Sequence, residues 1–156
     1  MVQKTNSYKA YIKATSTVAK TRQVVMLYDG AIRFLKQGAI AIREKRIEAR
    51  FHLLNKSSEI IVGLQSSIDF ENGDKIAHTL HGFYTQINRR ILAINFIKDM
   101  QESEKQCNEV IADLKQMRDV WDSIDQNLST KAGSNASENA APVSASGSDS
   151  GIVISA

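Results

Sequence analysis

Apolar side chains recur every three or four residues through most of this chain. The pattern covers four stretches, which run from Val24 to Ile42, Ile47 to Ile68, Ile76 to Ile97 and Cys107 to Leu128. The spacing averages about 3.5 residues, which is typical of the packing seam between helices in a bundle. The alternation that indicates β-strands is absent. The pattern therefore predicts four amphipathic helices and an all-α fold.

Short polar segments separate the predicted helices. Arg43–Arg46 and Lys98–Ser103 are long enough to form the first and third turns, and Asp69–Asp74 contains the strong turn dipeptide Asn72-Gly73. Short connections make successive helices antiparallel neighbours, and a helix of about 25 residues is about 38 Å long. We therefore expect an elongated antiparallel up-down-up-down four-helix bundle.

The pattern weakens at both ends of this bundle, which we place at residues 18–128. Residues 1–17 are predicted to form a short helical arm, and Thr17 is a candidate cap for the first long helix. One side of the arm is apolar and carries Tyr8, Tyr11 and Ile12. A segment this short is only marginally helical alone, so we expect it to dock on the bundle or to stay loose.

The last part of the chain, residues 129–156, has a different composition. It is rich in Ser, Ala, Gly and Asn and contains no aromatic residue. Such a segment buries too little apolar surface to order itself, so we predict a disordered tail. The tail finishes with the apolar sequence GIVISA, which the sequence alone explains better by chance than by docking.

Charge is unevenly distributed, although the net charge is only +3. Residues 1–56 hold 12 Lys and Arg against 3 Asp and Glu, whereas residues 57–130 hold 7 against 12. One interpretation is that the two halves pack together and compensate each other. The other is a basic surface that attracts an acidic partner or nucleic acid. The basic residues form no dense run, so we favour compensation and do not expect a nucleic-acid partner.

Catalytic and metal-binding patterns are missing from the sequence. There is no Glu-x-x-His pair of the kind that builds di-metal sites in bundles, no P-loop and no nucleophile elbow. His78 and His81 share one helix face, but no acidic cluster accompanies them on that helix. Cys107 lies on an apolar seam and is expected to behave as a small hydrophobe. We therefore predict neither an enzyme nor a bound cofactor or metal.

Three features of the sequence indicate the cellular compartment of the protein. A single cysteine excludes an internal disulfide and favours a reducing cytoplasm. No apolar run approaches the roughly 18 residues of a membrane span. The first residues lack the apolar core of a secretion signal. We expect a cytoplasmic protein that does not insert into membranes.

Glycines interrupt three of the predicted helices, at Gly30, Gly38, Gly63 and Gly82. A glycine inside a helix costs about 1 kcal/mol relative to alanine. We interpret these positions as points where another backbone approaches closely. Gly30 lies off the seam, so we expect it to admit a second neighbour, either the arm or a partner.

Several segments together resemble the FliS family of flagellin-specific export chaperones. "MLYDGAIRFLKQGA" is similar to the family signature, and "SIDFENGDKIAHTL" to its turn between the second and third helices. "FYTQINRRILAINFIKD" and "MRDVWDSI" resemble its third and last helices, and "AYIKATSTV" its tyrosine-bearing N-terminal arm. The likeness runs in order from Tyr8 to about Ile124. Family members usually carry Ser-Pro followed by Leu where the first helix begins, whereas this chain has Ala19-Lys20 and Gln23.

The resemblance implies a cytoplasmic chaperone that binds the disordered C-terminal region of flagellin. It implies prevention of premature polymerisation and delivery to the flagellar export gate, a second partner. We expect a monomer or weak homodimer. Apolar residues beyond the seams are expected to line the flagellin groove. The candidate partner-binding residues are Tyr8, Tyr11, Ile12, Leu27, Tyr28, Gly30, Leu80, Tyr84, Ile87, Ile91 and Asn95.

The sequence supports two further hypotheses. The first is that the arm covers part of the groove near Gly30 and is displaced when flagellin binds. The second is an alternative function, a self-associating structural or regulatory bundle whose basic surface contacts nucleic acid.

Overall fold

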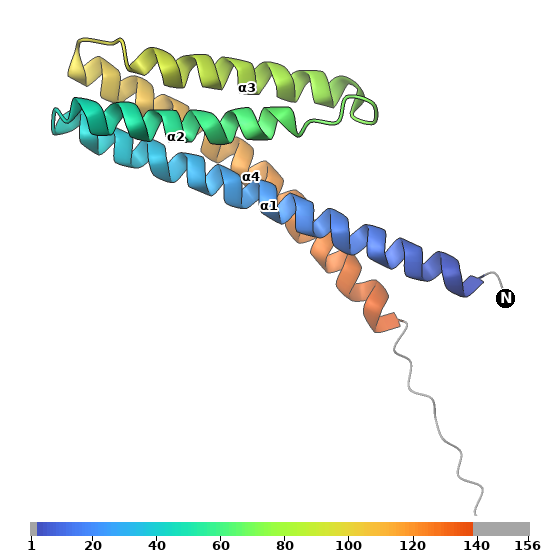
Figure 1. Cartoon of the computed structure of the whole chain (residues 1–156). Coiled ribbons are helices and arrows are strands. Elements are labelled where there is room, and N and C mark those ends of the chain that lie inside the picture. The colour runs from blue at the N-terminus through green and yellow to red at the C-terminus, as the bar shows by residue number, and fades with distance from the viewer. Residues whose placement is uncertain (1–2, 139–156) are drawn as a thin grey trace, which may run out of the picture.

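A computed structural model describes residues 3–138 of the chain. Over this range the structure consists of the helices α1 (Gln3–Arg43), α2 (Ile47–Ser66), α3 (Asp74–Ile94) and α4 (Met100–Glu138). Successive helices run antiparallel, and contacts join α1 to α2, α2 to α3, α3 to α4, and α4 back to α1 (Figure 1). The predicted four-helix up-down-up-down bundle is confirmed.

The core follows the predicted seams. Tyr28, Leu35 and Ile42 of α1 are fully buried, as are Leu54 and Ile61 of α2. The other two helices contribute a second set of buried apolar residues: Ile87, Ile91, Ile94, Cys107, Val110 and Leu114. These positions recur every three or four residues, so each helix buries one continuous stripe.

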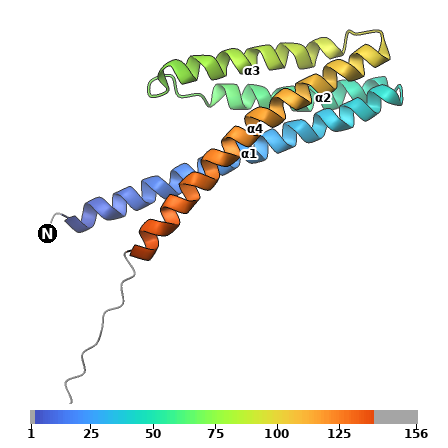
Figure 2. The ribbon, with the colours of Figure 1, turned by 180° about the vertical axis from the view of Figure 1, so that it is seen from behind.

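The helices α1 and α4 are much longer than the other two. Their outer parts project beyond the α2–α3 pair and separate from one another, as the views from both sides show (Figures 1 and 2). The helix α1 has no break near residue 18, and α4 runs ten residues past the expected end of the bundle at Leu128. Residues 129–138 are therefore helical, in contrast to the predicted tail. Residues 139–156 lie outside the described part of the chain.

Hydroxyl groups explain why α1 continues through its Ser- and Thr-rich segment. The Thr17 hydroxyl, expected to cap a helix start, instead donates to the Lys13 carbonyl at 2.8 Å. Ser16 donates to the same carbonyl at 2.9 Å. Such bonds satisfy the side chain inside a helix and remove its competition with the backbone. No proline interrupts this region, so nothing ends the helix here.

Two tight turns fix the connections. Lys45 has φ 58°, and the Arg46 amide donates to the Ala41 carbonyl at 2.9 Å, which is the Schellman arrangement that ends α1. Before α3, the Asp69 carboxylate accepts from the amides of Glu71 at 3.0 Å and Asn72 at 3.2 Å. The Asn72 side-chain amide also donates to Asp69 Oδ2, at 2.7 Å. This bond and then the backbone bonds lower the pKa of Asp69.

Gly73 closes the second turn and tolerates no side chain. A Cβ atom there would clash with the Asp69 carbonyl oxygen and with the Ala77 side chain. The predicted turn at Asn72-Gly73 is thus confirmed, and its glycine is required by a close approach of the backbone.

Candidate functional site

An apolar cavity lies where α3 and α4 diverge. In Figure 2, α4 starts beside the end of α3 and crosses away from it toward α1. The cavity has a volume of about 240 Å³. Its lining comes from all four helices and the loop before α3: Val24, Leu64, Ser67, Ile68, Asp69, Gly73, Ile76, Ala77, Leu80, Tyr84 and Trp121. Most of these side chains are apolar, so the cavity is suited to apolar groups.

A second hollow lies between α3 and the turns of α4 that precede Trp121. Its volume is also about 240 Å³, and Phe83, Met117 and Val120 supply its apolar lining. Asp113 and Gln116 form its polar edge. We call the two hollows together the α3–α4 wedge.

Spacing along α3 explains the wedge. Ile76, Leu80, Phe83 and Tyr84 follow one another at steps that place them on one helix face. That face continues the core stripe of α3, whose residues Ile87 and Ile91 belong to the same core cluster as residues of α4. Because α4 has moved away at the beginning of α3, the same stripe is left partly open there. Ile76 is 72% exposed.

A buried tyrosine pair lies behind the wedge, and Tyr84 of this pair contributes to the wedge lining. The Tyr28 hydroxyl donates to the Tyr84 hydroxyl at 2.9 Å, and the ring centroids are 6.2 Å apart. Burial raises the pKa of both hydroxyls, so both stay neutral. The Trp121 side chain lies close enough to lower the pKa of Tyr28 slightly, but its buried N–H does not reach hydrogen-bond geometry.

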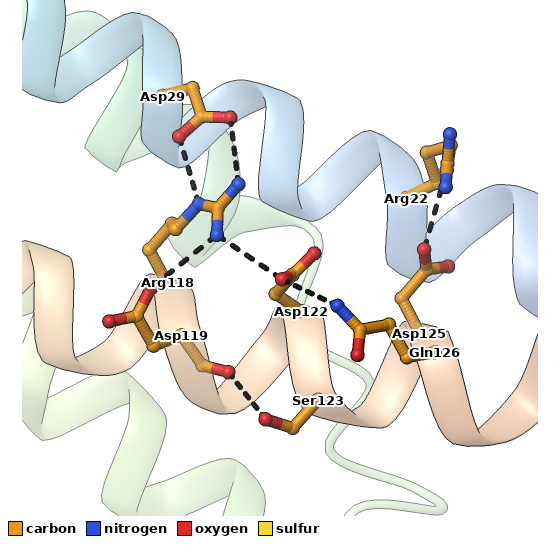
Figure 3. A network of polar contacts seen from close by, with 8 residues as sticks. All are labelled: Arg22, Asp29, Arg118, Asp119, Asp122, Ser123, Asp125 and Gln126. Atoms are coloured by element: carbon orange, nitrogen blue, oxygen red, sulfur yellow. Dashed lines mark hydrogen bonds and ion pairs between the residues drawn. The ribbon is translucent and has the colours of Figure 1, made fainter.

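Around Arg118, polar contacts hold α4 against α1 (Figure 3), whereas Arg90 of α3 pairs with Glu109 and Asp113 nearer the start of α4. Arg118 donates to both carboxylate oxygens of Asp29, at 2.9 and 3.4 Å, and lies 3.3 Å from Asp122 of its own helix. Asp29 is the main cause of a raised pKa for Arg118. A single exposed ion pair contributes little to the free energy of folding. A bidentate pair within a network, however, fixes how the two helices lie relative to each other.

About two turns beyond Arg118, the carboxylate of Asp125 is almost fully buried. Its side chain is 3% exposed, and it accepts from the Thr21 hydroxyl at 2.9 Å and from Arg22 Nε at 3.3 Å. A buried charge needs such partners, so α4 is tied to α1 at this point. This attachment sets the direction in which α4 leaves α3.

The contacts also bear on the uneven charge of the sequence. Arg22 pairs with Asp125, and Arg43 lies 3.2 Å from Glu104, so basic residues of α1 meet acidic residues of α4. This agrees with the expectation that the two halves compensate each other.

The structure divides the predicted partner-binding residues into separate groups. Leu80 and Tyr84 line the wedge. Tyr28, Ile87 and Ile91 are buried in the core, and their contact with flagellin stays a prediction. The stripe that faces the core is wider than a single seam and includes them.

Leu27, Gly30 and Asn95 lie away from the wedge lining. Leu27 is partly buried against the core. A Cβ at Gly30 would lie 3.4 Å from Ile60 Cδ1, so α2 is the neighbour that Gly30 admits. Asn95 follows the far end of α3, where its carbonyl accepts from Arg50 Nη2 at 2.8 Å.

The arm residues continue α1 and do not fold back. Ile12 is 48% exposed. Eighteen helical residues separate it from Gly30, a distance of about 27 Å, so the hypothesis that the arm covers a groove near Gly30 does not describe this structure. Tyr8 and Tyr11 belong to the helix, but their side chains lie outside the description.

Sequence reasoning missed the other lining residues of the wedge, which include Val24, Ile76, Phe83, Met117, Val120 and Trp121. The periodic pattern assigns most of these six to packing seams. No local signal distinguishes a covered stretch of seam from an open one, because the difference lies in the path of α4.

The histidines and the cysteine singled out in the sequence make packing contacts in the structure. Within residues 3–138, no group of three or more His, Cys, Asp and Glu could hold a metal ion. His78 and His81 instead flank the Phe70 ring, at centroid distances of 5.4 and 5.6 Å. Cys107 is buried, and desolvation raises its pKa to about 12, so it packs as the expected small hydrophobe. None of the four described helices is apolar over a length that could cross a membrane.

Comparison with known proteins gives a consistent set of relatives. The family model described as "Flagellar protein FliS" matches residues 4–128. The chain is 28% identical to a flagellar secretion chaperone FliS of Campylobacter jejuni over 127 residues, which cover 81% of this chain and 96% of the relative. It is 30% identical to the Vibrio cholerae protein of the same name over 76% of this chain and 88% of the relative. The Salmonella typhimurium protein of that name is also 30% identical, over 71% of this chain and 80% of the relative.

Proposed function

The chain belongs to the FliS family, and from this premise we propose that it is an export chaperone for flagellin. Its partner in this proposal is the C-terminal region of flagellin, which it binds in the cytoplasm and keeps from polymerising too early. It then assists delivery of the subunit to the flagellar export gate. The name of the curated relatives, flagellar secretion chaperone, supports the general role.

The observation that carries the flagellin proposal is the α3–α4 wedge. A partner helix that lays its apolar face into a groove is read by anchors at helical spacing. The wedge presents apolar side chains from two diverging helices, including Leu80 and Phe83 of α3 and Met117 of α4. Its exposed edge at Ile76 leaves apolar surface that a partner would cover.

Chaperone activity of this kind requires burial rather than catalysis. Flagellin polymerises through long terminal helices, and covering one of them leaves the subunit monomeric. The wedge offers contact along α3 and α4 without a reactive thiol, since the single cysteine, Cys107, is buried in the core. We therefore propose a binding protein and not an enzyme.

Calorimetric titration with a C-terminal fragment of flagellin from the same cell tests the proposal. We expect one-to-one binding with a micromolar or lower dissociation constant. The variant Ile76→Ser should weaken binding about 10-fold, because burial of this side chain contributes about 1.5 kcal/mol.

A matched control variant is Phe96→Ser at the other end of α3. Phe96 is 85% exposed and outside the wedge, so its replacement should change affinity by less than about 2-fold. Both residues are exposed, so both variants should remain folded. Absence of binding by the unmodified protein would refute the flagellin proposal, and equal effects of the two variants would place the binding surface elsewhere.

A further inference from the structure

The last six residues of the chain, Gly151–Ala156, share the chemistry of the wedge. They contain the apolar run Ile152, Val153 and Ile154 after a long polar segment. The sequence alone favoured chance for this run, but the structure adds an open apolar cavity of about 240 Å³. Sites for small-molecule ligands usually measure about 300–1,000 Å³, so this cavity is better suited to a few side chains.

The geometry of α4 places the segment within reach of that cavity. Trp121, in the cavity lining, precedes the last described residue, Glu138, by 17 helical residues, a distance of about 26 Å. Residues 139–151 can span up to about 45 Å when extended. A linker longer than the distance it must cross permits intramolecular binding at an effective concentration of millimolar order.

The residue types agree with an extended occupant. Three consecutive β-branched residues favour extended backbone, in which Ile152 and Ile154 point to the same face. The cavity lining is mostly apolar, with Val24, Leu80 and Trp121 among its members, so the apolar side chains of the segment supply the contact.

We propose that the chain's own segment Gly151–Ala156 occupies the α3–α4 wedge and competes with the export partner for it. The segment covers the exposed apolar edge at Ile76 while the chaperone is unoccupied. The competition with flagellin rests on the proposed function, whereas the docking of the segment does not. Competition of this kind lowers the apparent affinity for a partner by the fraction of molecules left open.

Trp121 is the only tryptophan of the chain, so its fluorescence reports on the wedge directly. We compare the full-length protein with the full-length double variant Ile152→Ser/Ile154→Ser. The expected result is stronger acrylamide quenching and a red-shifted emission for the double variant. A synthetic Ser150–Ala156 peptide at millimolar concentration should reverse both changes.

Val143→Ser is the matched control, because Val143 is an apolar residue in the same region outside the proposed docking segment. It should leave Trp121 quenching unchanged. The flagellin fragment should bind the double variant about 3- to 10-fold more tightly than the unmodified protein. Identical Trp121 signals for all three proteins would overturn the docking proposal. A flagellin fragment that binds none of them would overturn the proposed function instead, whatever the fluorescence shows.

Discussion

The tyrosine pair behind the wedge provides a sharp test of how the bundle is stabilised. Tyr28 and Tyr84 come from helices α1 and α3, which share no other direct hydrogen bond among those that the structure describes. Both side chains are essentially buried, at 0% and 2% exposure. The perturbation is a double-mutant cycle made of Tyr28→Phe, Tyr84→Phe and the double variant, each of which keeps the ring and removes only a hydroxyl.

The geometry sets the expected magnitudes. Each single replacement leaves the other hydroxyl buried without its partner, and the loss of such a partner costs about 1–3 kcal/mol. The double replacement removes both polar groups and leaves two apolar rings of the same shape, which is nearly neutral. We therefore expect each single variant to lose about 1–2 kcal/mol and the double variant to lose less than either one.

Urea and thermal unfolding of the four proteins measure this cycle. A loss of 1 kcal/mol corresponds to about 2–4 °C in the melting temperature for a chain of this size. Strictly additive losses would refute the reasoning, because additivity means that the two hydroxyls do not interact. If both single variants melted at the same temperature as the unmodified protein, water would have to reach the remaining hydroxyl.

The same pair predicts a dependence on alkaline pH. Burial raises the pKa of both tyrosines in the folded protein, whereas the unfolded value is about 10. Their neutral form contributes stability that is fully present below about pH 10 and is lost as the pH rises above it. The double phenylalanine variant should lose less stability than the unmodified protein between about pH 10 and pH 11.

Two further predictions concern the glycines and the cysteine. A Cβ at Gly63 or Gly82 meets no atom within 4 Å, so Gly63→Ala and Gly82→Ala should each raise stability by about 0.5–1 kcal/mol in urea unfolding. At Gly38 the added Cβ would lie 3.2 Å from Leu54 Cδ2, so Gly38→Ala should fall short of that gain, and equal gains at all three sites would contradict the packing described here. Burial raises the pKa of the Cys107 thiol to about 12, so iodoacetamide should label it only when the protein opens. Labelling as fast as that of a free thiol in the native protein would contradict its place in the core.

Local features made the four helices predictable. Each helix is long, carries an apolar residue every three or four positions and is free of proline, so its period can be recognised without knowledge of its neighbours. The turn at Asn72-Gly73 was predictable for the same reason, since Gly73 is required by contacts with residues only four positions away. The family resemblance then connected these helices to a chaperone of flagellar secretion, and the comparisons with known proteins confirmed the family.

Helix ends were harder to predict than helix centres. The Ser- and Thr-rich start of α1 favours a cap or a loop by composition, but Thr17 bonds back to Lys13 and the helix continues. The segment after Leu128 behaves similarly, with the Thr130 hydroxyl donating to the Gln126 carbonyl at 2.9 Å. Composition records the preference of a residue type, whereas the hydrogen bond that satisfies it depends on the conformation of its neighbours.

The glycines show how the same residue type differs by position. All four interior glycines predicted close backbone approach, but only Gly30 and Gly38 face a neighbouring helix, and Gly63 and Gly82 face open space. The sequence marks where a side chain is missing. It does not determine whether another helix lies opposite, because that depends on the packing of segments far apart in the chain.

The sequence by itself determined the helical periods, the turn at Gly73 and the apolar stripe along α3, because each follows from residues within a few positions of one another. Only the tertiary structure decided which part of that stripe is core and which part is open. Ile87 and Ile91 are buried, whereas Ile76 is exposed on the same helix. The difference arises because Asp29 and Thr21 of α1 hold α4 through Arg118 and Asp125. These partners are 89 and 104 residues apart in the chain, and the pattern along one helix carries no information on where such a distant contact places the neighbouring helix.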